Sequence, residues 1–374
     1  MQNDININPS DLELVERDEA IVDVEFSTES VSYLKDVWRR FRRDRVTMVA
    51  AGMVILVILM GIIGPQFSDF THTEQNVNLQ YLPPRIPGLE GLNLFNGSRV
   101  LTLQSTTLPR YEETGAIMEY IDSFDQPVRG GSVEMVVVRV DMYRYLGADD
   151  VYYWFGSDAL GRDLFTRLWT ATGTSLRLAF LVSFINLTIG LIIGSICGYY
   201  GGWIDLIVER IKEVIWAIPS IPLIIMLILL FGASFGTLMF VFCLTGWMGI
   251  SSGVRIQFYR YKGREYVLAS RTMGANDFRL MYKHILPNAA GTLITQMVLT
   301  VPFVVFQEAG LSYLGLGLQP PDTSIGLLLM EGQRNLLEYP YFITFPAIVI
   351  VLLMLAFNLF GNGLRDAFNP SLRQ

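Results

Sequence analysis

The sequence has little of the chemistry that builds metal or redox sites, because its 374 residues include only two cysteines and two histidines. Cys197 and Cys243 both fall in apolar runs, where a cysteine usually acts as a small buried hydrophobe. His72 and His284 are far apart in the sequence, and no cluster of cysteines or carboxylates accompanies either of them. We therefore expect no metal site and no disulfide.

Charged residues are also scarce, at 17% of the sequence, and no G-x-x-x-x-G-K-[ST] segment is present. Without that phosphate-binding loop we expect no ATP site and no cofactor on this chain. The net charge of -7 argues against a nucleic-acid partner. Hydrophobic residues make up 51% of the sequence, which is too apolar for a soluble domain of this size and fits a polytopic membrane protein with a soluble part.

Long uncharged runs predict six membrane-spanning helices, because crossing a bilayer takes about twenty mostly apolar residues. Val214–Val254 is roughly twice that length, and Gly232–Gly236 near its middle predicts a turn, so this run is expected to form a helical hairpin. The other spans are expected at Val46–Gly64, Leu178–Tyr200, Gly291–Phe306 with its flanks, and Tyr341–Asn362.

Basic residues predict the orientation of these spans, because short cytoplasmic loops are enriched in Lys and Arg. Five arginines within residues 38–45 place the N-terminus in the cytoplasm. Six spans return the C-terminus to the same side, and the strongly basic segment 255–290 is then cytoplasmic too. Two separate basic clusters thus agree on one topology. The Asp205–Lys212 segment is expected to be a nearly neutral loop.

The chain divides into four predicted parts. Residues 1–30 are acidic without a sustained apolar face, which predicts a disordered cytoplasmic tail. Residues 31–64 carry the basic segment and the first span, residues 65–155 form an extracytoplasmic insert, and residues 156–374 form a five-helix core with the cytoplasmic loop 255–290.

The insert is expected to contain β-structure. Ser132–Tyr145 is rich in β-branched and aromatic residues and predicts a strand, and Val100–Leu103 predicts another. Two interpretations of the insert stay open at this point. It is either a docking surface for a partner that delivers substrate or an inert cap that stabilises the first two spans.

Two polar segments beside the apolar runs carry most of the functional signal. The first, Gly156–Leu168, precedes the second span, and its Ser157 or Asp158 is expected to cap a helix, with Asp163 in the first turn and Arg162 paired to it. The second, Gly263–Asn288, is expected to form two short helices joined at Gly274. Leu268, Met273, Phe278, Leu280 and Met281 would supply apolar contact area on this loop.

Together these segments resemble the membrane permeases of ABC importers, most closely the C-type subunit of oligopeptide and dipeptide importers. Leu268-Ala269-Ser270 occupies the place of the family's E-A-A pattern, and Gly274 and Leu286-Pro287 match the glycine and the closing L-P. Leu268 departs from the family glutamate, and Glu265 lies one turn earlier. The motif before the second span is carried by Gly156, Ser157, Asp158, Gly161, Arg162 and Asp163, and the coupling loop by Glu265, Leu268, Ala269, Ser270, Gly274, Ala275, Asp277, His284, Leu286 and Pro287.

The resemblance implies an all-α, six-helix permease of the methionine-importer type, with a small extracytoplasmic β-containing insert whose size looks like that of the Gram-positive members. It also implies a homologous sister permease, two cytoplasmic ATPase subunits that hold ATP and Mg²⁺, and an extracytoplasmic peptide-binding protein or lipoprotein. The setting would be the lipid of a bacterial cell membrane. The family's short outer helix is matched by residues 324–332.

Two other classes of membrane protein are alternatives to a permease subunit. A stand-alone secondary transporter or channel normally carries charges inside its spans, and an intramembrane protease needs paired carboxylates or a Ser–His pair there. The predicted spans are almost free of such groups, with Glu308 placed near an outer end. Five polar residues are candidates for the substrate path, although helix–helix contact is the simpler role for each of them: Asn186, Trp247, Thr295, Gln296 and Gln307.

Overall fold

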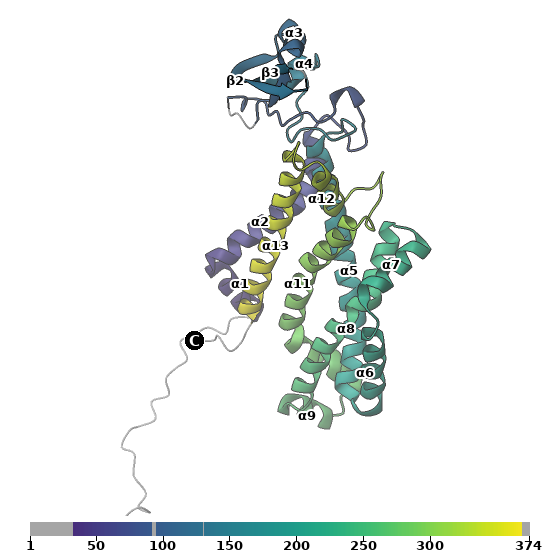
Figure 1. Ribbon diagram of the computed structural model, residues 1–374. Helices are drawn as coiled ribbons and strands as arrows, with labels where there is room; N and C mark the ends of the chain where they lie inside the picture. Colours follow the sequence, from purple (N-terminus) through teal and green to yellow (C-terminus); the bar gives the residue numbers. More distant parts are fainter. Residues whose placement is uncertain (1–32, 92–94, 130, 369–374) are drawn as a thin grey trace, which may run out of the picture.

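The computed structural model describes residues 33–91, 95–129 and 131–368. The predicted acidic tail, residues 1–30, lies outside this part of the chain. Long helices form a bundle, and a small β-sheet stands at one end of it (Figure 1). The helices long and apolar enough to cross a membrane are α2 (Arg45–Ile63), α5 (Leu164–Tyr200), α8 (Phe235–Lys262), α11 (Leu286–Tyr313) and α13 (Tyr341–Phe368).

Shorter elements complete the bundle and its ends. The shorter helices are α1 (Tyr33–Arg43), α3 (Leu108–Glu113), α4 (Met142–Tyr145), α6 (Gly202–Trp216), α7 (Ser220–Phe231), α9 (Glu265–Thr272), α10 (Asp277–Arg279) and α12 (Ile325–Arg334). The remaining turns are the 3₁₀ segments Gly64–Phe67, Val77–Leu79 and Ser105–Thr107 and the π-helical segment η5 (Leu280–Ile285).

The third predicted span is bent. Helices α6 and α7 meet at 77°, so the described chain has five spans, or six if this pair counts as one. The predicted turn between the third and fourth spans is confirmed, because α7 ends before Gly232 and α8 begins after Ser234. The predicted start of the hairpin at Val214 is wrong, since Val214 lies in α6, before the bend. Pro219 stands at the bend and has no backbone N–H to continue the helix.

The second span begins at Leu164 and not at Leu178 as expected. The uncharged run starts after Arg177, but the helix continues through this arginine toward the N-terminus. The cap is Asp163, whose carboxylate accepts hydrogen bonds from the backbone N–H groups of Phe165 and Thr166. The predicted caps Ser157 and Asp158 therefore lie outside the helix. A carboxylate at this position satisfies backbone donors that have no partner inside the first turn.

Glycines set the closest helix contact in the bundle. Gly190, Gly194 and Gly198 line the face of α5 that meets α8. A Cβ on Gly194 would lie 2.8 Å from that of Val254, and one on Gly198 would lie 2.6 Å from that of Phe258. The predicted role of this spacing in close packing is confirmed, because only residues without a side chain let the two backbones approach so far.

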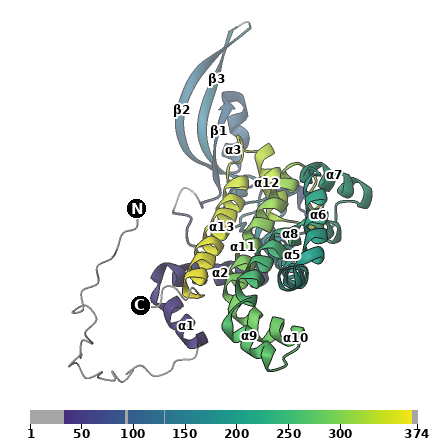
Figure 2. The ribbon, with the colours of Figure 1, turned by 90° about the horizontal axis from the view of Figure 1, so that it is seen from below.

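The insert contains a three-stranded antiparallel sheet of order β1–β3–β2. Its strands are β1 (Ser98–Gln104), β2 (Ile117–Val128) and β3 (Gly131–Asp141). Both predicted strands are present, but the one expected over Ser132–Tyr145 ends at Asp141, where the Asp141 carboxylate caps the helix α4. Strand β2 was missed, because all of its residues after Ile117 are exposed and its apolar residues do not alternate. Figure 2 shows the β2–β3 hairpin extending away from the bundle.

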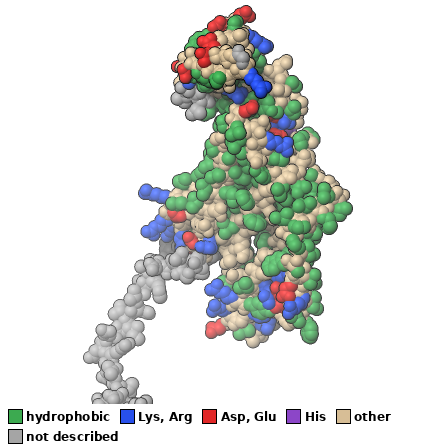
Figure 3. Space-filling view, in the orientation of Figure 1, with side chains coloured by type: hydrophobic (Ala, Val, Ile, Leu, Met, Phe, Trp, Pro, Cys, Tyr) green, Lys and Arg blue, Asp and Glu red, His purple; other side chains and the backbone are tan. Residues whose placement is uncertain are grey.

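Both described ends of the chain lie at the end of the bundle away from the sheet (Figure 1). Val37 and Phe41 of α1 pack against Ala367 near the end of α13. Lys and Arg side chains gather at this same end, whereas apolar side chains cover the middle of the bundle (Figure 3). This distribution is the one expected for a protein whose middle faces lipid.

Candidate functional site

Helices α9 and α10 form a protruding turn at the basic end of the bundle (Figure 1). Gly274 stands between them with φ of +86°, a left-handed conformation that a side chain would strain. Its backbone N–H donates to the carbonyl of Arg271 at 3.0 Å, and Asn276 caps α10 by accepting from the N–H of Arg279 at 2.9 Å. Two short helices joined at Gly274 are what the sequence predicts.

The outer face of this turn is apolar and exposed. Met273 is 81% exposed and Phe278 69% exposed, and Leu268 lies half-exposed beside them. Glu265, Ala269 and Asp277 are exposed on the same turn. Large apolar side chains standing free in a cluster are typical of a surface that another protein covers.

Three residues expected on that outer face are instead buried. Leu280 and Met281 are 0% and 5% exposed, and Ser270 is 8% exposed, with its hydroxyl donating to the carbonyl of Tyr266 at 2.9 Å. Partial burial also raises the pKa of the Tyr266 hydroxyl. These three residues are buried because helical periodicity places them on the face of the turn that meets the bundle.

The inner face fastens the turn to the bundle. Val267 of α9 and Leu280 and Ile285 of η5 are completely buried against Val254 and Phe258 of α8. Because a packed interior deforms little, a displacement of the outer face would move these contacts with it. The turn is therefore a rigid extension of α8 and α11.

A polar clamp reinforces this packing. The Arg271 guanidinium donates to the hydroxyl of Tyr199 at 2.7 Å, and that hydroxyl donates to the carboxylate of Asp277 at 2.5 Å. The bond to Tyr199 raises the pKa of Arg271. Lys262 also donates to the carbonyl of Gly198 at 3.0 Å. The sequence does not distinguish Tyr199 from other aromatic residues at the ends of spans, so its place at the centre of this clamp could not be predicted.

The segment Asp205–Lys212 is helical and not the loop expected, although its acidic and basic residues balance as predicted. It lies in α6, where Asp205 accepts from the guanidinium of Arg255 at 2.5 and 2.6 Å and from the hydroxyl of Tyr259 at 2.8 Å. Lys212 is 2% exposed and binds Glu209 at 2.6 Å. Asp205 therefore pairs with residues of α8, whereas Lys212 pairs with Glu209 inside α6.

The remaining predicted loop residues mark the return to the bundle. Leu286 begins α11 and Pro287 occupies its first turn, as expected. Ala275 and His284 are half-buried, and the carbonyl of His284 accepts from the side-chain amide of Asn288 at 2.7 Å. Ala275 and His284 are thus less exposed than Met273 and Phe278.

The second predicted motif, residues 156–163, is at the opposite end of the bundle and forms a closed junction. The hydroxyl of Ser157 donates to the carbonyl of Leu79 at 2.5 Å and accepts from the N–H of Leu82 at 2.8 Å. Gly156 and Gly161 have φ of +85° and +70°, and a Cβ on Gly156 would lie 2.7 Å from the ring of Tyr341. The motif thus joins the insert to the bundle.

A buried ion cluster completes this junction. The carboxylate of Asp158 accepts from Arg162 and from Arg167, each at 2.6 Å, and Arg167 also binds Glu331 at 2.8 Å. Arg167 is 2% exposed and Asp158 1% exposed. The predicted pair of Arg162 with Asp163 is wrong, because Asp163 faces its own helix terminus. Burial raises the pKa of the Asp163 carboxyl, and hydrogen bonds from Thr166 and Ser68 oppose that rise.

The candidate path residues inside the spans behave as packing groups in two cases. The side-chain amide of Asn186 donates to the carbonyl of Phe242 at 3.4 Å, and the hydroxyl of Thr295 donates to that of Gly291 at 2.9 Å. Glu308 lies in the last two turns of α11, near an end of the span as expected, and it is completely buried against Ser175 and Ser312. In the described ranges no three His, Cys, Asp or Glu side chains are grouped as metal ligands.

A membrane-spanning bundle with one exposed apolar turn at its basic end defines a multi-pass membrane protein of the permease class. The chain belongs to the family described as the binding-protein-dependent transport system inner membrane component, which matches residues 190–374, and its first part matches the N-terminal TM domain of oligopeptide transport permease C over residues 32–84.

Curated relatives support this assignment. The dipeptide transport system permease protein DppC of Bacillus subtilis is 34% identical over 92% of this chain and 88% of its own length. The oligopeptide transport system permease protein OppC of the same organism is 34% identical over 93% of each chain. A glutathione transport system permease protein of Pectobacterium atrosepticum is 34% identical over 59% of this chain and 73% of its own length. A solved inward-facing methionine ABC transporter chain aligns with 54% of this chain and 94% of its own, at 19% identity and a TM-score of 0.40.

Proposed function

We propose that this permease forms, with a homologous sister permease, the path by which oligopeptides or dipeptides enter the cell in an ABC importer. The relatives named for dipeptide and oligopeptide transport support the substrate class. The single observation that carries the mechanism is the exposed apolar turn around Gly274, whose inner face is locked into the bundle. A movable partner that grips this turn also moves α8 and α11.

The partner at this turn is one of two ATPase subunits, and ATP and Mg²⁺ are bound there and not on this chain. Met273 and Phe278 insert into a groove on the ATPase, and Ala269 lets the two surfaces approach. ATP binding brings the ATPases together, and the turn transmits that motion to the spans. The coupling requires that the ATPases bind the two permease conformations with different affinity.

The basic end faces the cytoplasm in this proposal. The arginines of α1 and the basic residues of α8 and α9 lie at that end, and short basic segments stay on the cytoplasmic side. The termini are then cytoplasmic, and the insert lies outside a bacterial cell membrane.

The insert receives the peptide-binding protein or lipoprotein. Strand β2 is one of the two edge strands of the sheet, and its side chains Met118, Tyr120, Ile121 and Phe124 are about half-exposed. An edge strand with exposed aromatic and branched residues provides both backbone hydrogen bonds and apolar area to a partner. This favours the docking interpretation over the inert cap.

The test is purification of the intact complex from its host membrane in mild detergent, followed by reconstitution. We expect two ATPases and a second permease to copurify, and we expect ATP-dependent peptide uptake into proteoliposomes when the binding protein is supplied. Uptake that proceeds without any ATPase subunit would contradict the proposal and support a stand-alone transporter.

A further inference from the structure

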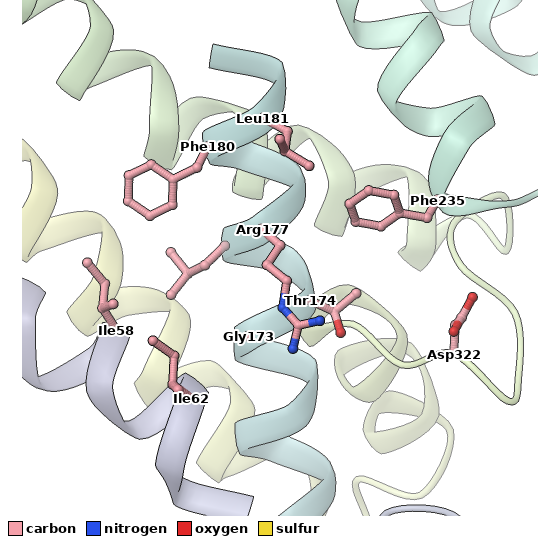
Figure 4. Close-up of a pocket in the computed structure, with 10 residues that line it drawn as sticks. Ile58, Ile62, Gly173, Thr174, Arg177, Phe180, Leu181, Phe235 and Asp322 are labelled. Atoms are coloured by element: carbon pink, nitrogen blue, oxygen red, sulfur yellow. The ribbon is translucent and has the colours of Figure 1, made fainter. Parts of the chain in front are cut away.

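A cavity of about 620 Å³ opens between α2, α5 and the start of α8, in the half of the bundle nearer the insert. Its walls are mostly apolar and include Ile58, Ile62, Phe180 and Phe235 (Figure 4). The volume lies in the range of about 300–1,000 Å³ that is typical of small-ligand pockets. The cavity is therefore large enough for a short peptide.

A cationic side chain points into this cavity. Arg177 extends from α5 into the space between α2 and the loop before α12 (Figure 4). It lies about 20 Å along the helix from Leu164, at 1.5 Å per residue, within a span that is apolar over most of its length. In the described part of the chain its guanidinium has no hydrogen bond or ion pair, although that of Arg167, ten residues earlier, is fully paired. A charge placed in a span without a partner marks a ligand or a water-filled path.

An acidic side chain stands across the same cavity. Asp322 lies on the exposed loop that precedes α12 and lines the cavity with Arg177. Neither a hydrogen bond nor an ion pair engages its carboxylate within the described residues, and it does not pair with Arg177. The two opposite charges line one apolar cavity and do not pair with each other. A ligand that carries both a negative and a positive charge could therefore bind between them.

We propose that this cavity binds the transported peptide as a zwitterion, with its C-terminal carboxylate on Arg177 and its N-terminal ammonium group directed toward Asp322. A guanidinium binds a carboxylate through two parallel N–H···O bonds, which fixes orientation as well as affinity. The apolar walls accept varied side chains without selecting among them. The inference rests on the proposed function and adds a recognition site for the two termini of the peptide.

The experiment compares Arg177→Gln with the unchanged protein, each in the full reconstituted complex with saturating binding protein. The substrates are trialanine and its C-terminal amide. We expect Arg177→Gln to lower trialanine uptake at least about tenfold and to change uptake of the amide by less than twofold, because the amide has no carboxylate to lose. Arg210→Gln, which removes an exposed cation of α6 outside the cavity, is the matched control and should change neither rate.

The second part of the experiment tests recognition of the N-terminal ammonium group of the peptide. Asp322→Asn should lower uptake of trialanine more than that of N-acetyltrialanine. An equal loss for blocked and unblocked peptides would overturn the proposal, and a simultaneous loss of the sister permease on purification would assign Arg177 to the subunit interface instead. These failures are distinct from failure of the proposed function, in which the unchanged complex would transport no peptide.

Discussion

The guanidinium of Arg271 donates a hydrogen bond of 2.7 Å to the hydroxyl of Tyr199, which ties the end of α9 to the end of α5. The same hydroxyl donates to Asp277, on the other side of Gly274. One phenol group therefore holds both arms of the exposed turn. Contacts of this kind decide whether a force on the turn reaches the spans or is lost in local bending.

Tyr199→Phe should loosen the turn without removing the packing of the ring. Each lost bond to a charged group contributes roughly 1–2 kcal/mol at a partly exposed site. We expect faster amide hydrogen exchange in α9 and fewer peptides imported per ATP hydrolysed. Tyr200→Phe alters the neighbouring exposed ring and should leave both measurements unchanged. Unaltered exchange in Tyr199→Phe would show that packing alone holds the turn.

Gly274→Trp should uncouple ATP hydrolysis from uptake while the protein stays in the membrane. The left-handed backbone at Gly274 costs roughly 1–2 kcal/mol for any residue with a Cβ, and the ring would also stand on the outer face. Gly263→Trp is a suitable control, since Gly263 has φ of −93° and open space around it. Normal uptake by the Gly274 variant would contradict a coupling role for the turn.

Arg167→Met should destabilise the junction between the insert and the bundle. The change leaves the buried carboxylate of Asp158 with only Arg162, and breaking a buried ion pair costs about 3 kcal/mol or more. We expect a lower midpoint of thermal unfolding in detergent. Arg144→Met removes an exposed arginine 3.9 Å from Asp149 and should shift the midpoint little. Equal shifts would mean that the cluster is not a stabilising element.

Gly194→Val should separate α5 from α8. The added side chain would overlap Val254 and the backbone of Ser251, and overpacking of this kind costs about 1–3 kcal/mol. We expect reduced yield of folded protein and a lower unfolding midpoint. The same substitution at Gly249, where a Cβ meets nothing within 4 Å, should be tolerated. A stable Gly194→Val protein would show that the two helices can move apart freely.

Expectations from the sequence held where a residue's own neighbours decide the structure. A run of about twenty apolar residues has no lower free-energy alternative than a spanning helix, so the long spans and the turn near Gly232 were predictable. Two short helices at Gly274 follow from glycine's access to the left-handed conformation. Five spans with a bent sixth were less predictable, because a proline permits a bend without setting its angle.

Contacts between distant segments were decided only by the tertiary structure. The local sequence favours the pair of Arg162 with Asp163, but the folded chain pairs Arg162 with Asp158. Arg167 joins that carboxylate and also binds Glu331 of α12, a contact that only the approach of α12 makes possible. Tyr199 and Asp205 carry no local signal, since their partners are 50 residues or more away. The sequence by itself determined that this chain crosses a membrane and where its basic turn lies, because burial of apolar runs is a local property. Which face of the turn is exposed, and which charges remain free in the cavity, depended on packing that no single segment contains.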